Sequence, residues 1–302
     1  MNKIATHTKF RFDFTKFQAR TNRRILFDKI AKVAFFLSTI FVILILSILF
    51  YQIITKSIGW LNWKFLSGNL SISAQKAGIF GVIIGSLLLM SVVIPLTLII
   101  GVATAIYLEE YAAKNRFNLF LRINISNLSG VPSVIFGLLG LTVFSRLLHL
   151  GSSVLAGGLT MSLLVLPIVI VASQEAIKAV PGFLREASYA IGATKWTTII
   201  RVVIPTALPG ILTGSILALS RAIGETAPLV VLGIPALILR IPGSLLDDFT
   251  ALPVQIYYWT LDSVLVKEYA NLAAATIIVL LIILFVLNLI AIFIRNKYQR
   301  RF

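Results

Sequence analysis

Residues 206–232 read TALPGILTGSILALSRAIGETAPLVVL, and they place Arg221 and Glu225 one helical turn apart within a largely apolar segment. A central arginine in a membrane helix costs about 3 kcal/mol even on the lowest scale, so an ionisable residue there is a functional-site hypothesis by default. The i, i+4 spacing puts both side chains on one helix face, where they can pair instead of facing lipid. We predict that this face lines a bundle interior or a polar pathway.

The composition of the whole chain indicates a membrane protein. Of its 302 residues, 58% are hydrophobic and 13% are charged, which excludes an ordinary soluble domain. Apolar stretches of about 20 residues, the length that crosses a bilayer, predict six spans. These lie near 33–55, 78–107, 131–149, 154–173, 206–232 and 272–294. The expected fold is an all-α polytopic membrane protein with six transmembrane helices.

The segments outside the spans complete the expected organisation. A basic leader occupies 1–32, the first transmembrane helix 33–55, a core with five transmembrane helices 78–294, and a basic tail 295–302. The leader is too long and too basic, and the first span too long, for a cleaved signal peptide. We therefore expect residues 33–55 to be a retained helix.

The distribution of lysine and arginine predicts the orientation in the membrane. If the amino terminus is cytoplasmic, the segments on that side hold twenty of these residues and the outer segments hold six. The six are Lys56, Lys64, Lys76, Arg146, Arg240 and Lys267. Both termini of this multi-pass protein are therefore expected in the cytoplasm, with the spans in the bacterial inner (plasma) membrane and in contact with its lipid. The net charge of +16 is mostly a topology signal, because the basic residues flank spans and form no single patch for nucleic acid.

Several kinds of chemistry are excluded or disfavoured by what the sequence lacks. The chain contains no cysteine, which excludes disulfides, thiolate metal sites and cysteine nucleophiles. With His7 and His149 as its only histidines, no histidine metal cluster is expected. Glu109 and Glu110 follow the second span, and we interpret them as a solvated helix end because consecutive residues point to different helix faces. No catalytic residue is predicted.

A helix, a turn and a second helix are predicted in the cytoplasmic segment, within 181–203. Pro181 suits a first helical turn, Gly192 can adopt a left-handed conformation that closes the helix, and Thr194 can cap a second helix. Pro205 then marks the entry to the fifth span. The apolar stripe of this helix pair either packs under the transmembrane bundle or docks in a groove of a soluble partner.

Six residues of this segment carry a family resemblance. They are Glu186, Ala187, Gly192, Val202, Ile204 and Pro205, which stand at the spacing of the EAA loop of ATP-binding cassette importer permeases. Ser188 replaces the second alanine of that motif, and Val202 and Ile204 replace its usual isoleucine and leucine. The resemblance implies the type I importer permease fold, with this loop as the coupling helix that receives force from an ATPase subunit.

Four strings narrow the resemblance to the PstA family of phosphate transporter permeases. They are YLEEYA at 107–112, GVPSVIFGLLGL at 130–141, SRAIGETAPLV at 220–230 and DFTALPVQIYYW at 248–259. The first three also resemble the paralogous PstC family, whereas the TAP after Gly224 and Glu225 and the last string favour PstA. The likeness runs from about Asn62 to the last span, and the leader up to about Lys32 resembles no family.

The resemblance implies a permease subunit of an ATP-driven phosphate importer, which works with a PstC-like permease, an ATPase dimer and an external phosphate-binding protein. No Gly-Lys pair occurs in the chain, so it has no P-loop, and ATP is used by the partner. The chain is then expected to bind no cofactor and no metal. In that family the arginine and glutamate of the RAIGE segment have been proposed to contribute to the phosphate path. The resemblance therefore implies that Arg221 and Glu225 are candidates for the phosphate path of this chain.

The chemistry of the pair leaves its role open at this point. Arg221 offers a planar fork of donors to a phosphate oxygen, whereas Glu225 opposes an anion unless it is paired or protonated. The alternative is a purely structural ion pair. Three other functions also stay in view, namely a permease for another oxyanion, a secondary transporter acting alone, and an intramembrane hydrolase. Few histidines and the lack of an acidic pair within a span argue against the hydrolase.

The orientation can be tested with reporter fusions. Because the lysine and arginine asymmetry places both termini inside, a reporter fused after Phe302 should be active only in the cytoplasm. A reporter inserted near Asp247 should be active only outside. Opposite labelling at either position would mean that the number of spans is wrong.

Overall fold

The computed structural model describes residues 14–113, 115–238 and 240–298, and these are almost entirely helical. Within them, five helices are long and apolar enough to cross a membrane, and a sixth span is formed if a sharply bent helix pair counts as one. The expectation of an all-α polytopic membrane protein is confirmed. The β-structure of the described residues is a single isolated bridge between Ser153 and Asp248.

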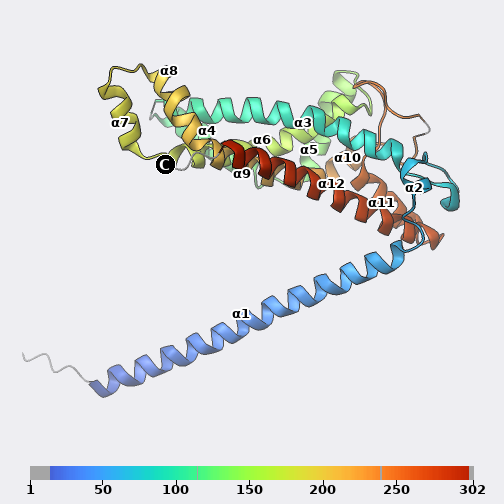
Figure 1. Ribbon diagram of the computed structural model, residues 1–302, viewed down its shortest axis with the longest axis horizontal. Helices are drawn as coiled ribbons and strands as arrows, with labels where there is room; N and C mark the ends of the chain where they lie inside the picture. Colours follow the sequence, from blue (N-terminus) through green and yellow to red (C-terminus); the bar gives the residue numbers. More distant parts are fainter. Residues whose placement is uncertain (1–13, 114, 239, 299–302) are drawn as a thin grey trace, which may run out of the picture. The chain divides into compact units, whose positions relative to one another are not determined.

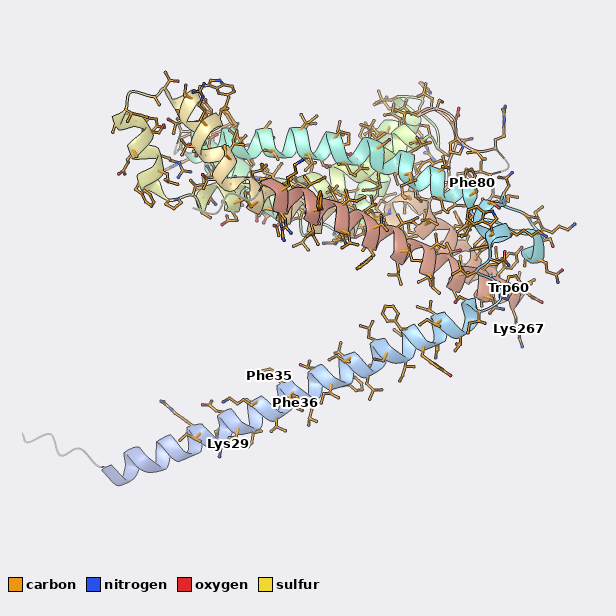
Figure 2. The ribbon with its side chains drawn as sticks, viewed as in Figure 1. Lys29, Phe35, Phe36, Trp60, Phe80 and Lys267 are labelled. Carbon is orange, nitrogen blue, oxygen red and sulfur yellow. The ribbon has the colours of Figure 1, made fainter. Side chains whose placement is uncertain are left out.

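Helix α1 (Phe14–Ser57) contains the first candidate span, Phe27–Ser57. Its apolar side chains are exposed on every side, among them Phe35 (74%) and Phe36 (65%), which project from the helix in Figure 2. The residues up to Gln52 form a compact unit separate from the rest of the chain. A helix that is apolar all round is typical of a segment surrounded by lipid or by other membrane helices.

The second unit, from Ile53 onward, is built on four long helices that run side by side (Figure 1). They are α3 (Phe80–Ile106), α6 (Val154–Lys178), α9 (Ile204–Ile223) and α12 (Glu268–Tyr298). Helix α6 lies between α3 and α9, and α12 packs against α9. Predicted spans 78–107, 154–173 and 272–294 correspond to α3, α6 and α12.

The predicted span at 131–149 is one arm of a bent pair. Helix α4 (Arg116–Leu128) and the continuous run of α5 (Ser133–Leu139) and η3 (Gly140–Leu147) meet at 105°. Pro132 stands at the break with an extended ψ of 134°, and a proline also disfavours helical conformation in the residue before it. The second arm alone is therefore shorter than the prediction.

The prediction of one continuous span over 206–232 is wrong. Helix α9 ends at Ile223, and a separate helix α10 (Ala227–Leu232) follows after a break. The reason is Pro228, which has no N–H to donate to the carbonyl of Gly224 and whose ring would clash with it. Gly224 and the two residues after it therefore leave the helix, and α10 packs against α5.

The end of the second unit at which α3 begins carries short elements. It holds α2 (Trp63–Ser67), η1 (Ala74–Lys76) and α11 (Leu252–Asp262), on the right in Figure 1. The backbone N–H groups of Gly243 and Ser244 donate to Oδ2 of Asp247, which holds the pKa of that carboxyl below its usual value. Asp247 in turn accepts from the Val154 N–H at 3.1 Å through its carbonyl, so the loop is tied to the start of α6.

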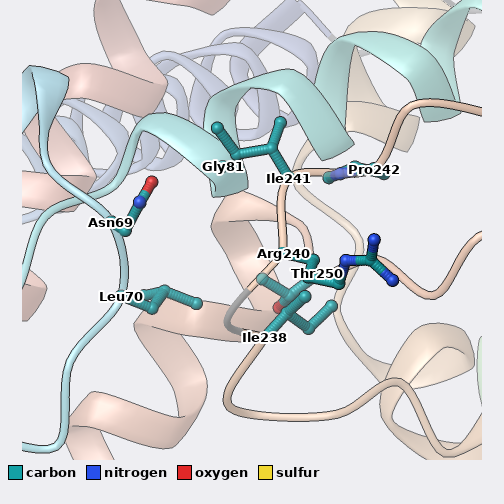
Figure 3. Close-up of a pocket in the computed structure, with 8 residues that line it drawn as sticks. All are labelled: Asn69, Leu70, Gly81, Ile238, Arg240, Ile241, Pro242 and Thr250. Carbon is teal, nitrogen blue, oxygen red and sulfur yellow. The ribbon is translucent and has the colours of Figure 1, made fainter.

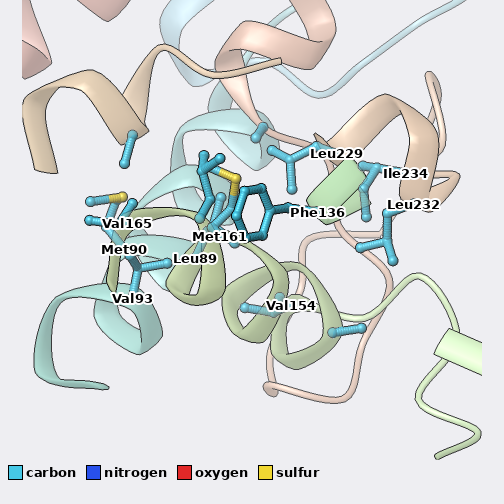
Figure 4. Packing of buried hydrophobic residues seen from close by; sticks show 14 of the residues in the cluster. Leu89, Met90, Val93, Phe136, Val154, Met161, Val165, Leu229, Leu232 and Ile234 are labelled. Carbon is cyan, nitrogen blue, oxygen red and sulfur yellow. The ribbon is translucent and has the colours of Figure 1, made fainter. Parts of the chain in front are cut away.

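The main core lies where α3, α5, α6 and α10 meet, as Figure 4 shows. Phe136 of α5 is surrounded there by Met161 of α6, Leu89 of α3 and Leu229 of α10. A second cluster, which we call the Ile177 cluster, joins α3, α6 and α9. It comprises Ala105, Ile177, Val180, Val203, Ala207 and Ile211. These two clusters fix the ends of α9 against the bundle.

The two GxxxG pairs of the sequence, Gly81 and Gly85 in α3 and Gly210 and Gly214 in α9, differ in how closely their neighbours approach. A Cβ on Gly85 would lie 2.2 Å from the carbonyl oxygen of Thr250, whereas one on Gly81 would meet its nearest atom at 3.7 Å. A Cβ on Gly214 would lie 2.5 Å from the Cβ of Ala172 on α6. Gly85 and Gly214 therefore permit close backbone packing.

Gly85→Ala should destabilise the protein by about 1–3 kcal/mol, because the added methyl group must push backbone aside. Gly81→Ala in the same helix is the matched control and should change stability little. Thermal unfolding of both variants in detergent, followed by the loss of monodisperse protein, measures the difference. Equal melting temperatures for the two variants would contradict the packing described at Gly85.

Candidate functional site

The first candidate site is the charged pair at the end of α9. Arg221 lies in the last turn, Glu225 follows the helix end, and Nε of Arg221 donates to Oε1 of Glu225 at 3.3 Å. The predicted pair therefore forms. The side chain of Arg221 is 62% exposed and that of Glu225 is 19% exposed. The arginine thus lies outside the interior of this chain's own bundle.

The geometry leaves most of the guanidinium available. Within the described part of the chain, the Arg221 guanidinium makes no hydrogen bond other than the one from Nε. The neighbouring side chain, Ser220, donates to Oδ1 of Asn288 on α12. The two terminal amino groups of Arg221 make no hydrogen bond to the described residues. They can donate to an anion or to a second protein chain.

The second candidate site is the helix pair at the cytoplasmic end, on the left in Figure 1. Helix α7 (Gly182–Ala190) carries Glu186 and Ala187, both exposed, and a turn at Gly192 leads to α8 (Lys195–Thr198). Gly192 has the predicted left-handed backbone, with a φ of 85°. Thr194 caps α8 as predicted, its side chain accepting from the Thr197 N–H.

The second helix of the pair is not a separate short element. Helix α8 continues through η4 (Ile199–Val203), a π-helical stretch, into α9, so that Lys195–Ile223 forms one helical run of 29 residues. Pro205 does mark the entry to the span as predicted, since α9 begins at Ile204, but no break separates α9 from α8. Pro205 has no N–H to donate, and the wider π-turn before it keeps the chain helical, with Ile204 N–H donating to the Ile199 carbonyl.

The apolar stripe of this region divides between the bundle and the outside. Leu184 packs against the Ile177 cluster, and Ser188 forms a buried hydrogen bond with Thr198 at 2.9 Å that joins the two helices. Phe183 (66% exposed), Ile191 (86%) and Trp196 (62%) instead face outward. Large apolar side chains exposed together mark an interaction surface. We call these three residues the docking surface.

The six motif residues therefore fall into two groups. Glu186, Ala187 and Gly192 are exposed next to the docking surface, whereas Val202, Ile204 and Pro205 are half-buried at the root of α9. Arg221 and Glu225 lie near neither group. Arg221 is in the last turn of the helical run that begins at Lys195, and Glu225 follows the end of that run.

The interpretation of Glu109 and Glu110 as a solvated helix end is wrong. The side chains are only 11% and 9% exposed, and each forms an ion pair. Glu109 accepts from Arg122 of α4, and Glu110 accepts from Arg185 of α7 at 2.9 Å. The adjacent carboxylates do point in different directions, as expected for consecutive residues. Arg185 lies 75 residues away from Glu110, and a single sequence gives no signal for that pairing.

Two cavities of the second unit lack what an anion needs. A groove of about 240 Å³ between α3, α9 and α12 is lined by aliphatic side chains and by Ser215, Ser220 and Asn288. An anion there would lose its hydration without a cation to compensate. The cavity in Figure 3, next to Arg240 and Thr250, measures about 10 Å³, which is room for one water molecule at most. Neither cavity fits a hydrated oxyanion.

The fold is that of a multi-pass membrane protein with an exposed apolar helix pair at one end of its bundle. Residues 97–302, more than half of the chain, match the family described as binding-protein-dependent transport system inner membrane component. The chain belongs to this family.

Individual relatives narrow the family assignment to one type of permease. The chain is 35% identical over 209 residues to the probable ABC transporter permease protein YqgI of Bacillus subtilis, covering 69% of this chain and 71% of that protein. It is 35% identical to the phosphate transport system permease protein PstA 1 of Mycobacterium tuberculosis, covering 72% of each chain. It is 32% identical to PstA of Haemophilus influenzae, covering 83% of this chain and 86% of that one. Within its family, the chain is thus of the PstA type.

Solved structures share the fold. A bacterial alginate ABC transporter in complex with a pentasaccharide-bound periplasmic protein has a chain that matches with a TM-score of 0.62 at 15% identity, covering 89% of this chain and 94% of that one. An inward-facing MetNI methionine ABC transporter has a chain that matches with a TM-score of 0.57 at 16% identity, covering 74% and 95%. The expected ABC importer permease fold is confirmed.

Gly192→Val should weaken coupling without preventing membrane insertion. A β-branched residue at this positive φ is strained by about 1–3 kcal/mol, and the space around Gly192 is open, so no steric clash adds to the effect. Gly192→Asn is the matched control, because asparagine tolerates the left-handed conformation. The measurements are ATPase co-purification and phosphate uptake. Normal values for the valine variant would show that Gly192 takes no part in coupling.

Proposed function

We propose that this chain is a transmembrane permease subunit of an ATP-driven phosphate importer. It forms the translocation path with a homologous PstC-like subunit and couples to an ATPase dimer through the loop that contains Glu186, Ala187 and Gly192. An external binding protein delivers phosphate. The chain itself catalyses no reaction and binds no cofactor, and ATP is used by the partner subunit.

One observation carries the proposal: Trp196 of the docking surface and Arg221 of the charged pair lie in one helical run. Lys195–Ile223 begins beside the docking surface and ends two residues beyond Arg221. At roughly 1.5 Å per residue, its 29 residues extend about 43 Å, the thickness of a bilayer with its headgroups. A displacement imposed on α8 by a cytoplasmic partner therefore moves the helix that presents Arg221. A stand-alone transporter has no need for this connection.

Phosphate as the cargo is supported by the relatives and by Arg221. Two of the relatives are phosphate transport system permeases by name. The free terminal amino groups of Arg221 provide the planar pair of donors that matches phosphate oxygens. Pairing through Nε keeps Glu225 from opposing the anion as an unpaired charge. The alternative is a permease for another oxyanion, because the same fork also binds other tetrahedral anions and the binding protein selects among them.

The orientation belongs to the same proposal. The docking surface and the carboxyl-terminal part of α12 lie at one end of the second unit, and the loop around Asp247 lies at the other (Figure 1). With the docking surface in the cytoplasm, both chain termini are cytoplasmic and the Asp247 loop faces the external binding protein. The membrane is the bacterial inner membrane.

The test is purification of the tagged chain from its native membrane, followed by reconstitution into liposomes with the external binding protein. An ATPase subunit should co-purify, and phosphate should stimulate ATP hydrolysis more than sulfate does. If another oxyanion, and not phosphate, stimulated ATP hydrolysis, that anion would be the cargo. Purification without any ATPase, with transport retained, would establish a stand-alone transporter and refute the proposal.

The role of Arg221 can be separated from simple neutralisation of Glu225. A hydrogen bond to a charged group contributes about 1.5–3 kcal/mol, so Arg221→Ala should lower phosphate uptake about 10- to 100-fold. Arg221→Lys keeps the charge but loses the fork, and it should recover only part of the uptake. The measurement is uptake per assembled complex.

The double variant Arg221→Ala with Glu225→Ala decides between the two roles. It removes both charges, so no unpaired charge remains in the membrane. If Arg221 contacts the anion, this variant should assemble and stay inactive. Near wild-type uptake would show that the arginine only neutralises Glu225.

A further inference from the structure

The end of α3 contacts three different cytoplasmic elements through three consecutive residues. They belong to η2 (Tyr107–Tyr111), a π-helical turn in which Ala112 N–H donates to the Tyr107 carbonyl. Glu109 pairs with Arg122 of α4, Glu110 pairs with Arg185 of α7, and the ring of Tyr111 lies 4.9 Å from Nζ of Lys195 in α8. A π-turn inserts one residue into a helix and often occurs at functional sites. Two of the three contacts reach the two helices that carry the docking surface.

Arg185 is the most highly connected side chain of this region. Its Nε and one terminal nitrogen both donate to Oε1 of Glu110, at 3.2 and 2.9 Å. The terminal nitrogens also donate to the carbonyls of Val180, at 2.7 Å, and Ile177, at 3.0 Å. These carbonyls are at the end of α6, where a cation is favoured by the helix dipole. One side chain on α7 thus binds the ends of both α6 and α3.

Helix α7 has few other attachments. Of its nine residues, only Ser188 is buried, and Leu184 supplies its apolar contact with the Ile177 cluster. Ser188 joins α7 to α8, and hence to α9, through Thr198. Removal of the Arg185–Glu110 contact would leave Leu184, through that cluster, as the contact between α7 and α3. The pair is 22% and 9% exposed, so solvent screens it less than a surface ion pair.

We propose that the Arg185–Glu110 pair transmits displacement of α7 to the transmembrane helix α3, so that α3 and α9 move together when an ATPase moves the docking surface. The inference rests on the proposed function, because it requires an ATPase partner. Arg185 and Glu110 are positioning residues, since neither contacts the transported anion. Without the pair, ATP hydrolysis continues and moves α9, but α3 follows less closely and less phosphate is transported per ATP.

The test compares Glu110→Gln with Glu109→Gln in the reconstituted complex. The two positions are adjacent, carry the same charge and are equally buried, but only Glu110 contacts α7. Glu110→Gln should lower the phosphate transported per ATP hydrolysed about tenfold, as expected for the loss of a charge-assisted hydrogen bond. Its ATPase rate and ATPase co-purification should stay near wild type. Glu109→Gln should leave the transport ratio near wild type.

Failure of this inference is distinguishable from failure of the proposed function. A wild-type complex without phosphate-stimulated hydrolysis would refute both. A wild type that couples normally, together with a Glu110→Gln variant that couples equally well or fails to assemble, would refute only the transmission role. Equal loss of coupling in the Glu109→Gln control would likewise refute a specific role for Glu110.

A rescue experiment uses the absence of cysteine from the chain. The double variant Glu110→Cys with Arg185→Cys should be uncoupled, and a short bifunctional thiol reagent that joins the two positions should restore transport per ATP. Each single variant, treated with the same reagent, is the control. Cross-linked complexes that stay uncoupled would show that the contact does not carry the motion.

Discussion

Pro205 has no amide hydrogen to donate, yet the helix passes through it because Ile204 N–H reaches back to the Ile199 carbonyl across a π-turn. The rest of the proposed mechanism depends on this hydrogen bond. Within a membrane, a broken helix leaves polar backbone groups unsatisfied unless they are buried in protein or face water. The π-turn avoids a break and keeps α8 and α9 continuous. The docking surface and Arg221 can then move as parts of one body, and a hinge at Pro205 would instead absorb the displacement.

At Ile223, in contrast to Pro205, the helix does break, and Glu225 is separated from α9. Gly224 and Pro228 end α9, so Glu225 lies beyond the helix and reaches back to Nε of Arg221. The charged pair therefore stands at a helix end, where the carbonyls of Arg221 and Ala222 accept from the N–H groups of Gly224 and Glu225. Gly224 and Pro228 therefore account both for the interruption of the span and for the position of the pair.

Much of this arrangement could be predicted from the sequence, and the failures have identifiable reasons. Apolar length found α3, α6 and α12, and glycine chemistry found the left-handed turn at Gly192, because both depend on local properties. The span at 206–232 was wrong because apolar length was given more weight than Pro228. The burial of Glu109 and Glu110 was missed because their partners Arg122 and Arg185 lie 13 and 75 residues away. Local pattern carries no information about such pairings.

Both wrong predictions, the span at 206–232 and the solvated helix end at Glu109 and Glu110, fall where a regular membrane helix is interrupted. Three irregular segments, η2 at the end of α3, η4 before α9 and the break after Ile223, coincide with the contacts on which the proposals rest. At η2 the extra residue of the π-turn directs Glu109 and Glu110 to separate partners, α4 and α7. At η4 it carries the helix past Pro205. Regular helices hold the bundle together through their small and aliphatic residues, whereas the irregular turns determine which helices move together. A coupled transport subunit requires both, because rigid helices without defined connections would transmit no displacement from the cytoplasm to Arg221.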